Sequence, residues 1–461
     1  MKRLDRTGGI VAAMMLLIAA CSSSDPTPGS TTTSSVSVGP VSTTSIDPAG
    51  EQNSSEASTD IASTSCREGN AESTAWLTGS SVEAETLQEP SGGQPGVDVV
   101  VYPRPDYPGR PWSQWGQGIV LGDGRMLSAI GDHVGADGNS YLYEYDPHTR
   151  TLTQFADALT VVGHESGEWG FGKIHAPMVK GSCDDVYVST YWGTRRGLTF
   201  TEHYQGDVLM RIDPEARTIE DLGVILPEHG VASMASWPEG GLIYAEAADP
   251  FGQKTGSFVV LDMTTGNVIF EDNDPSHGGY RSIAVDAQGR AYITWDDDGL
   301  ARYDPATNSL IPLDTSMPGS ILRWATPPDA TNVVYAVSRD PATFFSIDAG
   351  GDIRQIAPAQ GYTTSMALAP GGETFYYVPD AHGGAWEHGT SLIAVDTATG
   401  AETVIVELNP LIESATGLRT GGTYNVVIDP SGERIYVGLN AGDPSSGDTF
   451  GEIVLAIVTL P

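Results

Sequence analysis

A hairpin motif that recurs along the chain constrains the fold more than any other feature of the sequence. In residues 300–313, LARYDPATNSLIPL, two short strand-like segments flank an Asp-Pro-Ala-Thr-Asn-Ser turn. The aspartate caps such a turn through its side chain, and the proline fixes φ at the next position. The motif therefore predicts two antiparallel strands joined by a tight turn.

The same motif occurs five more times, at 141–155, 208–222, 258–270, 344–356 and 392–406. Its turn aspartates are Asp146, Asp213, Asp262, Asp304, Asp348 and Asp396, at intervals of 67, 49, 42, 44 and 48 residues. A period of about 40–50 residues with four strands per unit is typical of a β-propeller. The units predict an all-β fold, a seven-bladed β-propeller with four-stranded antiparallel blades.

The seventh unit has only three strand-like segments and lacks the outermost strand. Two strand-like segments precede the repeats, Ala75–Leu87 and Val97–Tyr102. We expect one of them to supply the missing strand, because closing the ring removes an exposed sheet edge.

The N-terminus indicates export. Basic residues at its start precede an apolar run from Ile10 to Ala20, which is too short to span a bilayer. Residues 17–21, LIAAC, resemble a bacterial lipobox, which implies cleavage before Cys21 and lipid attachment to it. We therefore expect a protein that is exported and anchored by lipid at the bacterial cell surface or envelope, with the membrane as a partner through the lipid on Cys21.

A segment rich in Ser, Thr, Pro, Gly and Ala follows, and residues 22–65 contain no Lys, Arg or aromatic residue. This composition cannot bury enough apolar surface to offset the entropy of ordering the chain. The sequence predicts a signal peptide over 1–20, a lipid-anchored disordered linker over 21–65 and the propeller domain over 66–461. As a flexible coil, the linker would reach on the order of 35–40 Å.

Two further cysteines, Cys66 and Cys183, are expected to form a disulfide, since an exported protein lies in an oxidising compartment. Two free thiols are the alternative. The net charge of −36 argues against nucleic acid or an anionic membrane surface as the main partner. We expect a monomer.

Loop lengths predict which face of the propeller carries function. Strand direction alternates within a blade, so the connections between strands B and C and those between blades emerge on the same face. Nearly all the long connections are of these two kinds, and insertions in repeat scaffolds carry function. Eight of the nine histidines fall on this long-loop face, and His148 falls on the other.

Aromatic and polar residues of the long-loop face are candidates for binding a carbohydrate or a small polar ligand. They are His229, His277, Tyr280, Trp324, Tyr362, His382, Trp386 and Tyr424. Arg281 and Arg323 stand close to the propeller axis, and arginine suits bidentate contact with a carboxylate or sulfate. Pairing of each arginine with a neighbouring acid is the alternative.

No strong catalytic signature or metal motif such as H-E-x-x-H occurs. The sequence assigns no cofactor and leaves a divalent metal open, with His382 and His388 as the candidate ligands.

Over residues 100–461 the repeats resemble secreted bacterial propellers of the YVTN, streptogramin-lyase and quinoprotein-like type. The placement of His175 and Tyr191 beside Arg281 and Arg323 is similar to that in seven-bladed polysaccharide lyases acting on uronic acids. This resemblance implies that the arginines neutralise a carboxylate, while His or Tyr moves protons during β-elimination. The metal pattern Q-x-x-H-x-H of oligogalacturonate lyases is absent.

Three functions follow as hypotheses. The first is binding of a carbohydrate or small polar ligand on the long-loop face. The second is β-elimination of a uronate polymer at the same place, and the third is a scaffold for protein partners.

Overall fold

The turn aspartates act as predicted in the computed structural model of the chain, which describes residues 73–105, 112–165, 167–193, 204–249 and 256–461. Each of the six accepts hydrogen bonds of 2.7 to 3.1 Å from main-chain N–H groups two to four residues further on. These bonds close the turn between the third and fourth strands of six blades. The predicted signal peptide and linker, together with Cys21 and Cys66, lie outside the described residues.

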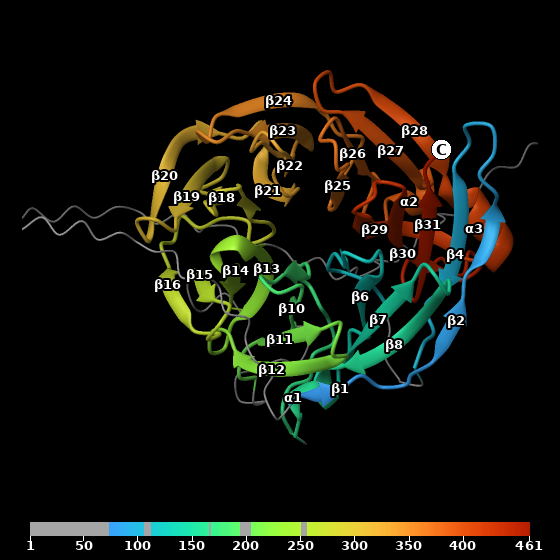
Figure 1. Cartoon of the computed structure of the whole chain (residues 1–461), viewed down its shortest axis with the longest axis horizontal. Helices are drawn as coiled ribbons and strands as arrows, with labels where there is room; N and C mark the ends of the chain where they lie inside the picture. The colour runs from blue at the N-terminus through green and yellow to red at the C-terminus, as the bar shows by residue number, and fades with distance from the viewer. Residues whose placement is uncertain (1–72, 106–111, 166, 194–203, 250–255) are drawn as a thin grey trace, which may run out of the picture. The chain divides into compact units, whose positions relative to one another are not determined.

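Seven antiparallel sheets surround a common axis, as predicted (Figure 1). Blade 1 comprises β5 (Ile119–Val120), β6 (Met126–Gly131), β7 (Ser140–Asp146) and β8 (Thr151–Asp157). Blade 2 comprises β9 (Val179–Lys180), β10 (Val186–Ser189), β11 (Val208–Asp213) and β12 (Thr218–Val224). Blade 3 comprises β13 (Gly230–Trp237), β14 (Leu242–Ala248), β15 (Ser257–Asp262) and β16 (Val268–Asp272). Blade 4 comprises β17 (Ala284–Val285), β18 (Ala291–Trp295), β19 (Gly299–Asp304) and β20 (Ser309–Ser316). Blade 5 comprises β21 (Ser320–Ala325), β22 (Val334–Arg339), β23 (Thr343–Ile347) and β24 (Ile353–Pro358). Blade 6 comprises β25 (Met366–Leu368), β26 (Thr374–Tyr377), β27 (Ser391–Asp396) and β28 (Glu402–Glu407). In each blade the first strand lies nearest the axis and the fourth at the rim.

Blade 7 closes the ring with strands from both parts of the chain. Its members are β29 (Arg419–Ile428), β30 (Arg434–Gly442), β31 (Glu452–Thr459) and β4 (Gly96–Val101). Strand β4 pairs with β31 from Val101 opposite Val454 to Gly96 opposite Thr459. The prediction that an upstream segment supplies the missing strand is confirmed.

The residues before β4 form a belt around the rim that the sequence did not predict in detail. The expected strand-like stretch from 75 to 87 is divided among β1 (Thr74–Ala75), β2 (Ser81–Glu83) and β3 (Glu85–Gln88). They add a fifth strand to blades 2, 1 and 7, respectively. The division has a physical reason, since one continuous strand cannot follow the rim across blades.

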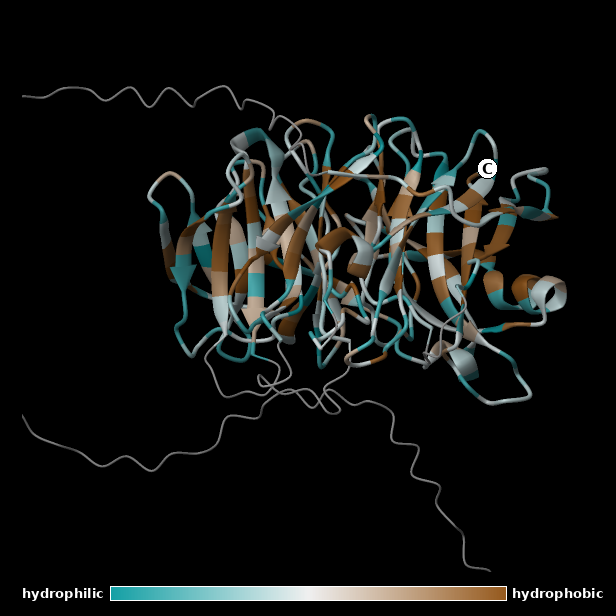
Figure 2. Cartoon of the chain, turned by 90° about the horizontal axis from the view of Figure 1, so that it is seen from below, coloured by the Kyte–Doolittle hydropathy of each residue, from teal (hydrophilic) through white to brown (hydrophobic). Residues whose placement is uncertain are grey.

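Hydrophobic clusters fill the spaces between neighbouring blades, one cluster at each of the seven interfaces. In Figure 2 hydrophobic residues lie along the strands and hydrophilic residues towards both ends of the blades. Because every interface is packed, each blade depends on two neighbours and the ring has no free end.

Short helices lie in the connections: α1 (Ala158–Val162), the 3₁₀ turn η2 (Pro238–Gly240), α2 (Ala385–His388) and α3 (Leu408–Thr416). None of the helices in the described residues has the length and apolar character needed to cross a membrane. Cys183 is disulfide-bonded. Since Cys66 is not among the described residues, the pairing of these two cysteines stays a prediction.

Ring closure can be tested at Val99, which lies in β4 with 2% of its surface exposed. We expect Val99→Ala to lower the free energy of unfolding by about 2 kcal/mol, because it leaves a cavity between the closing strand and the core. Val404→Ala is the matched control, since Val404 lies on the outer strand β28 and is 52% exposed. Chemical denaturation measures both variants, and equal effects would contradict a core role for β4.

Candidate functional site

Trp115 lies among side chains from several blades near the propeller axis. Its ring centroid lies 5.1 Å from that of His133, 5.0 Å from that of Tyr424 and 5.4 Å from that of His382. The Nζ atom of Lys173 lies 4.2 Å from the same ring centroid. These residues belong to blades 1, 7, 6 and 2, and side chains from such different blades meet only near the axis.

His175 and Arg281, two of the predicted catalytic residues, contact each other although blade 3 separates their blades. Arg281 Nη1 donates a hydrogen bond to His175 Nε2 at 2.9 Å, and His175 Nδ1 donates to the Ala232 carbonyl at 2.8 Å. A guanidinium can only donate and a carbonyl can only accept, so the imidazole is neutral with its proton on Nδ1. Both ring nitrogens are therefore engaged.

Arg323, also predicted as catalytic, is 5% exposed and lies against tyrosines. Its Nε donates to the Tyr362 hydroxyl at 2.7 Å, and its guanidinium lies 5.9 Å from the centroid of the Tyr424 ring. The Arg339 guanidinium lies 5.6 Å from the centroid of the Tyr362 ring. The Tyr424 hydroxyl is 2.6 Å from His382 Nδ1.

We call this group the axial cluster. It consists of Trp115, His133, Lys173, His175, Arg281, Arg323, Arg339, Tyr362, His382 and Tyr424. Six blades contribute to it.

The imidazoles of the axial cluster are neutral at pH 7. Burial lowers the pKa of His133, His175 and His382, and the charge of Lys173 lowers it further in each case. Arg281 adds to the effect at His175 and His382. The positive charge of the cluster is therefore carried by lysine and arginine.

The pKa values of the two tyrosines beside Arg323, Tyr362 and Tyr424, are shifted in opposite directions. Burial acts to raise the pKa of both, but at Tyr362 the charges of Arg323, Arg281 and Arg339 outweigh it and hold the pKa below its ordinary value. At Tyr424 burial and the neighbouring Tyr362 prevail, and the pKa lies above its ordinary value. The Tyr362 hydroxyl therefore loses its proton at a lower pH than the Tyr424 hydroxyl.

Left-handed backbone conformations surround the axial cluster. They occur at His133, Tyr280, Ile321 and His382, with φ of 57°, 43°, 50° and 62°. Tyr280 directly precedes Arg281, and Ile321 lies two residues before Arg323. Each such conformation costs about 1–3 kcal/mol and persists only where the surrounding structure fixes it, often at functional sites. The segments that carry both arginines are held in such conformations.

Other predicted site residues lie outside the axial cluster and have structural contacts. Trp324 packs in the hydrophobic core and donates from Nε1 to the Met366 carbonyl at 3.2 Å. The ring of Tyr191 lies between His175 and Trp192, at centroid separations of 4.8 and 4.5 Å.

The remaining predicted residues are dispersed over the long-loop face. His229 Nδ1 lies 2.7 Å from the Pro227 carbonyl, and His277 is paired with Asp272 at 2.8 Å. The Arg419 guanidinium lies over the ring of Trp386, 5.4 Å from the ring centroid. The partners in these three contacts do not belong to the axial cluster.

His382 and His388, the candidate metal ligands, have different partners. His382 contacts Tyr424, whereas His388 pairs with Asp380 at 2.7 Å. Within the described ranges, no group of three or more His, Cys, Asp or Glu residues could hold a metal ion.

The sequence did not single out Trp115, His133 or Arg339 as site residues. Trp115 lies four residues before β5, and His175 lies four residues before β9. Comparing these equivalent positions between repeats would have identified Trp115. Arg339, at the end of β22, carries no comparable signal, because its approach to Tyr362 depends on how blades 5 and 6 pack.

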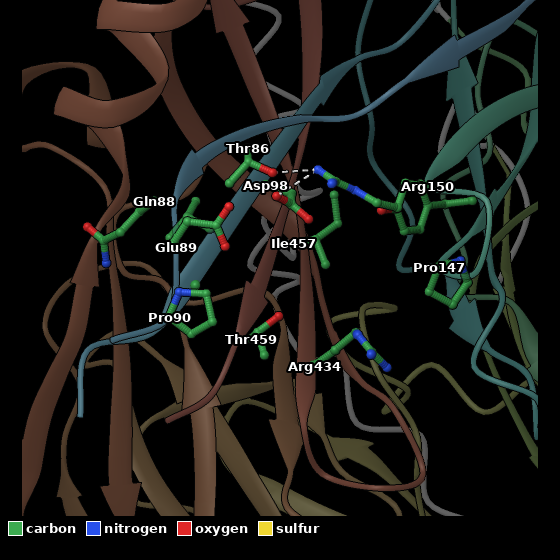
Figure 3. Close-up of a pocket in the computed structure, with 13 residues that line it drawn as sticks. Thr86, Gln88, Glu89, Pro90, Asp98, Pro147, Arg150, Arg434, Ile457 and Thr459 are labelled. Carbon is green, nitrogen blue, oxygen red and sulfur yellow. Dashed lines mark hydrogen bonds and ion pairs between the residues drawn. The ribbon is translucent and has the colours of Figure 1, made fainter. Parts of the chain in front are cut away.

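A small polar cavity of about 200 Å³ lies elsewhere, between the belt and blades 7 and 1. Arg150 lies at its edge and donates to Asp98 at 3.0 Å and to Thr86 at 2.7 Å (Figure 3). Arg434 and Thr459 complete its lower part in the same view. None of the predicted site residues lines this cavity.

No protein-family model matches the sequence, and no curated protein matches it either. Solved structures share its fold. Selenomethionine-substituted virginiamycin B lyase from Staphylococcus aureus is 12% identical with a TM-score of 0.51, over 79% of this chain and 100% of that chain. A catalytically inactive variant of that lyase with quinupristin is 11% identical with a TM-score of 0.50, over 79% of this chain and 100% of that chain.

A streptogramin B lyase structure is similar to the same degree, at 11% identity and a TM-score of 0.50 over 79% of this chain and 98% of that chain. The predicted resemblance to propellers of the streptogramin-lyase type is thus confirmed for the fold. Identity this low carries no statement about activity.

The electrostatics of the axial cluster can be tested by NMR titration of the histidine rings. We expect the His175 ring to remain neutral as the pH falls well below 6.5, the ordinary pKa of histidine, because burial and Arg281 disfavour its cation. Arg281→Gln should raise the pKa of His175. A wild-type ring that titrates near 6.5 would contradict the assigned contacts.

Proposed function

We propose that this protein is an exported, lipid-anchored β-propeller that binds an anionic carbohydrate at the axial cluster. The observation that supports it best is the convergence of Lys173, Arg281, Arg323 and Arg339 in a chain of net charge −36. All four charges act on the same side chain, His382. A local cluster of positive charge in a protein of negative net charge favours an anionic ligand.

The contacts of Arg323 support a role in binding rather than in an ion pair. In the described ranges its partners are the Tyr362 hydroxyl and the rings of Tyr362 and Tyr424, and no carboxylate is among them. A buried guanidinium keeps its charge, and it suits a carboxylate or sulfate through two parallel hydrogen bonds. A bound anion would supply the charge that this arginine lacks.

Aromatic rings beside the cations favour a sugar over a bare ion. Trp115, Tyr362 and Tyr424 present ring surface next to Lys173 and Arg323. Rings of this kind bury the apolar face of a sugar, while the cations bind its acidic group. An acidic sugar such as a uronate combines both features.

The anchor remains the expectation drawn from the N-terminal sequence. Lipid on Cys21 would attach the chain to the membrane, and the linker up to residue 65 would hold the propeller at a distance from it. A monomer is sufficient for this function, because the axial cluster is built from one chain.

Binding can be tested with the purified full-length chain and oligogalacturonate, using neutral dextran oligosaccharides as the comparison. We expect calorimetry to detect the acidic sugar alone, and Arg323→Gln to weaken its binding about 30-fold, or about 2 kcal/mol. Arg354→Gln is the matched control, since Arg354 is exposed on β24 and bonds the Thr397 carbonyl at 2.9 Å. Equal binding of neutral and acidic sugars would argue against an anion site. Binding of neither would favour the protein scaffold.

A second candidate function is β-elimination of a uronate polymer, and the opposite acidities of Tyr362 and Tyr424 favour it. Groups at one site with pKa values pushed apart are suited to act as base and acid. His175, expected to move protons, has both nitrogens engaged. The two tyrosines are therefore better placed for this chemistry.

In this reaction Arg323 and Arg281 pair with the carboxylate of the sugar. The Tyr362 phenolate takes the proton from C5, and the electron pair left behind forms the double bond between C4 and C5. The bond from C4 to the leaving oxygen breaks, and the Tyr424 hydroxyl gives that oxygen its proton. Transfer of a proton from Tyr362 to Tyr424 restores the starting state.

The ultraviolet absorbance of unsaturated uronates measures this reaction. We expect turnover of polygalacturonate to fall at least 100-fold in Tyr362→Phe while binding is retained, because the variant lacks only the base. Tyr204→Phe is a control, since Tyr204 is a buried tyrosine bonded to Asp207. Binding without any new absorbance in the wild type would restrict the protein to the binding function.

A further inference from the structure

Glu246 is a buried acid close to the axial cluster that the proposed function does not use. It lies in β14 with 1% of its surface exposed. Ser233 donates a hydrogen bond of 2.5 Å from its hydroxyl to Glu246 Oε2. In the described part of the chain, Glu246 Oε1 is buried and has no hydrogen-bond partner. A carboxylate in this position would be poorly satisfied, so the neutral acid is favoured.

Among the described residues, few charged or titratable groups face Glu246. Strand β13 supplies Ser233 and β15 places Phe258 opposite, and neither residue titrates. The segment before β17 contributes Tyr280 and Arg281, which both interact electrostatically with Glu246. Arg281 is therefore the cation that an ionised Glu246 would meet.

Burial raises the pKa of Glu246 to about 8, although the Ser233 hydroxyl, the Arg281 charge and the Arg281 main-chain N–H group all act to lower it. At pH 7 the acid is mostly neutral, and the charge of Arg281 is not neutralised by it. Above pH 8 the carboxylate forms and is attracted to Arg281.

Building on the proposed function, we propose that Glu246 is a positioning residue that competes with the anionic ligand for Arg281. As a neutral acid it does not attract the Arg281 guanidinium, whereas as a carboxylate it attracts this guanidinium and repels the anionic ligand. Binding of the anion and ionisation of Glu246 therefore oppose each other.

Proton linkage follows from this competition. A bound anion disfavours a second negative charge nearby, so the pKa of Glu246 is higher in the complex than in the free protein. The complex then holds more protons than the separate components, and binding takes up a proton. Affinity is greatest below pH 8 and falls as the pH rises through that value.

Tyr362 is the other residue of the axial cluster that gains negative charge at higher pH, since its pKa lies below the ordinary value. It would also weaken the binding of an anion when it ionises. A test must therefore separate Glu246 from Tyr362, and Tyr362→Phe is the matched variant.

The test measures binding of trigalacturonate to the full-length chain by calorimetry at pH 6.5, 8 and 9.5, in buffers of different ionisation enthalpy. The carboxylates of this probe stay ionised throughout. We expect proton uptake and a loss of affinity of up to about tenfold per pH unit above pH 8 in the wild type. Glu246→Gln should keep the affinity seen at pH 6.5 and lose the decline, whereas Tyr362→Phe should retain the decline.

Ser233→Ala gives a second test that does not depend on the glutamine variant folding. Because the Ser233 hydrogen bond lowers the pKa of Glu246, its loss should move the decline to higher pH. An unchanged decline in both Glu246→Gln and Ser233→Ala would overturn the inference and leave the proposed function intact. Absence of binding at pH 6.5 in the wild type would instead overturn the proposed function, and the inference with it.

Discussion

The pairing of β4 with β31 is the interaction on which the rest of this structure depends. A row of packed sheets that did not close into a ring would have two ends. The sheet at each end would leave one hydrophobic face uncovered and unpaired strand edges exposed. Here the strand from 96 to 101 lies beside the strand from 452 to 459, so residues more than 300 positions apart share one sheet. Seven packed interfaces result, and the first strands of all blades are held around one axis.

That arrangement explains why the axial cluster is partly buried and cationic in an acidic protein. Six of the seven blades contribute one or two side chains each, from their two inner strands or the connections next to them, and no blade could form the cluster alone. The contact of His175 with Arg281 spans blade 3, and the contacts of Trp115 join blades 1, 2, 6 and 7. Positive charge is stable there because rings, neutral imidazoles and hydroxyls surround it.

The fold could be predicted from the sequence because its main signal is local. The Asp-capped turn needs only a few consecutive residues, and its recurrence sets the length of the repeat. The site could be predicted only in part, since Arg281 and Arg323 stand out as rare cations near the axis. Trp324 illustrates why the rest could not: it follows Arg323 in β21, and successive side chains of a strand point to opposite sides. Arg323 thus faces the cluster, whereas Trp324 enters the core. The role of Glu246 depends on packing between blades 3 and 4, which no local pattern encodes.

The belt has a mechanical consequence. Residues 1–72 precede β1, so once the predicted Cys66–Cys183 disulfide is reduced, a pulling force applied through them reaches the rim strands in the order β1, β2, β3 and finally β4. The first three are only two, three and four residues long, and each is the outermost strand of its sheet. They can detach one after another while the four-stranded blades beneath them stay whole. The rim therefore yields in steps, and the load arrives last at the strand that keeps the ring closed.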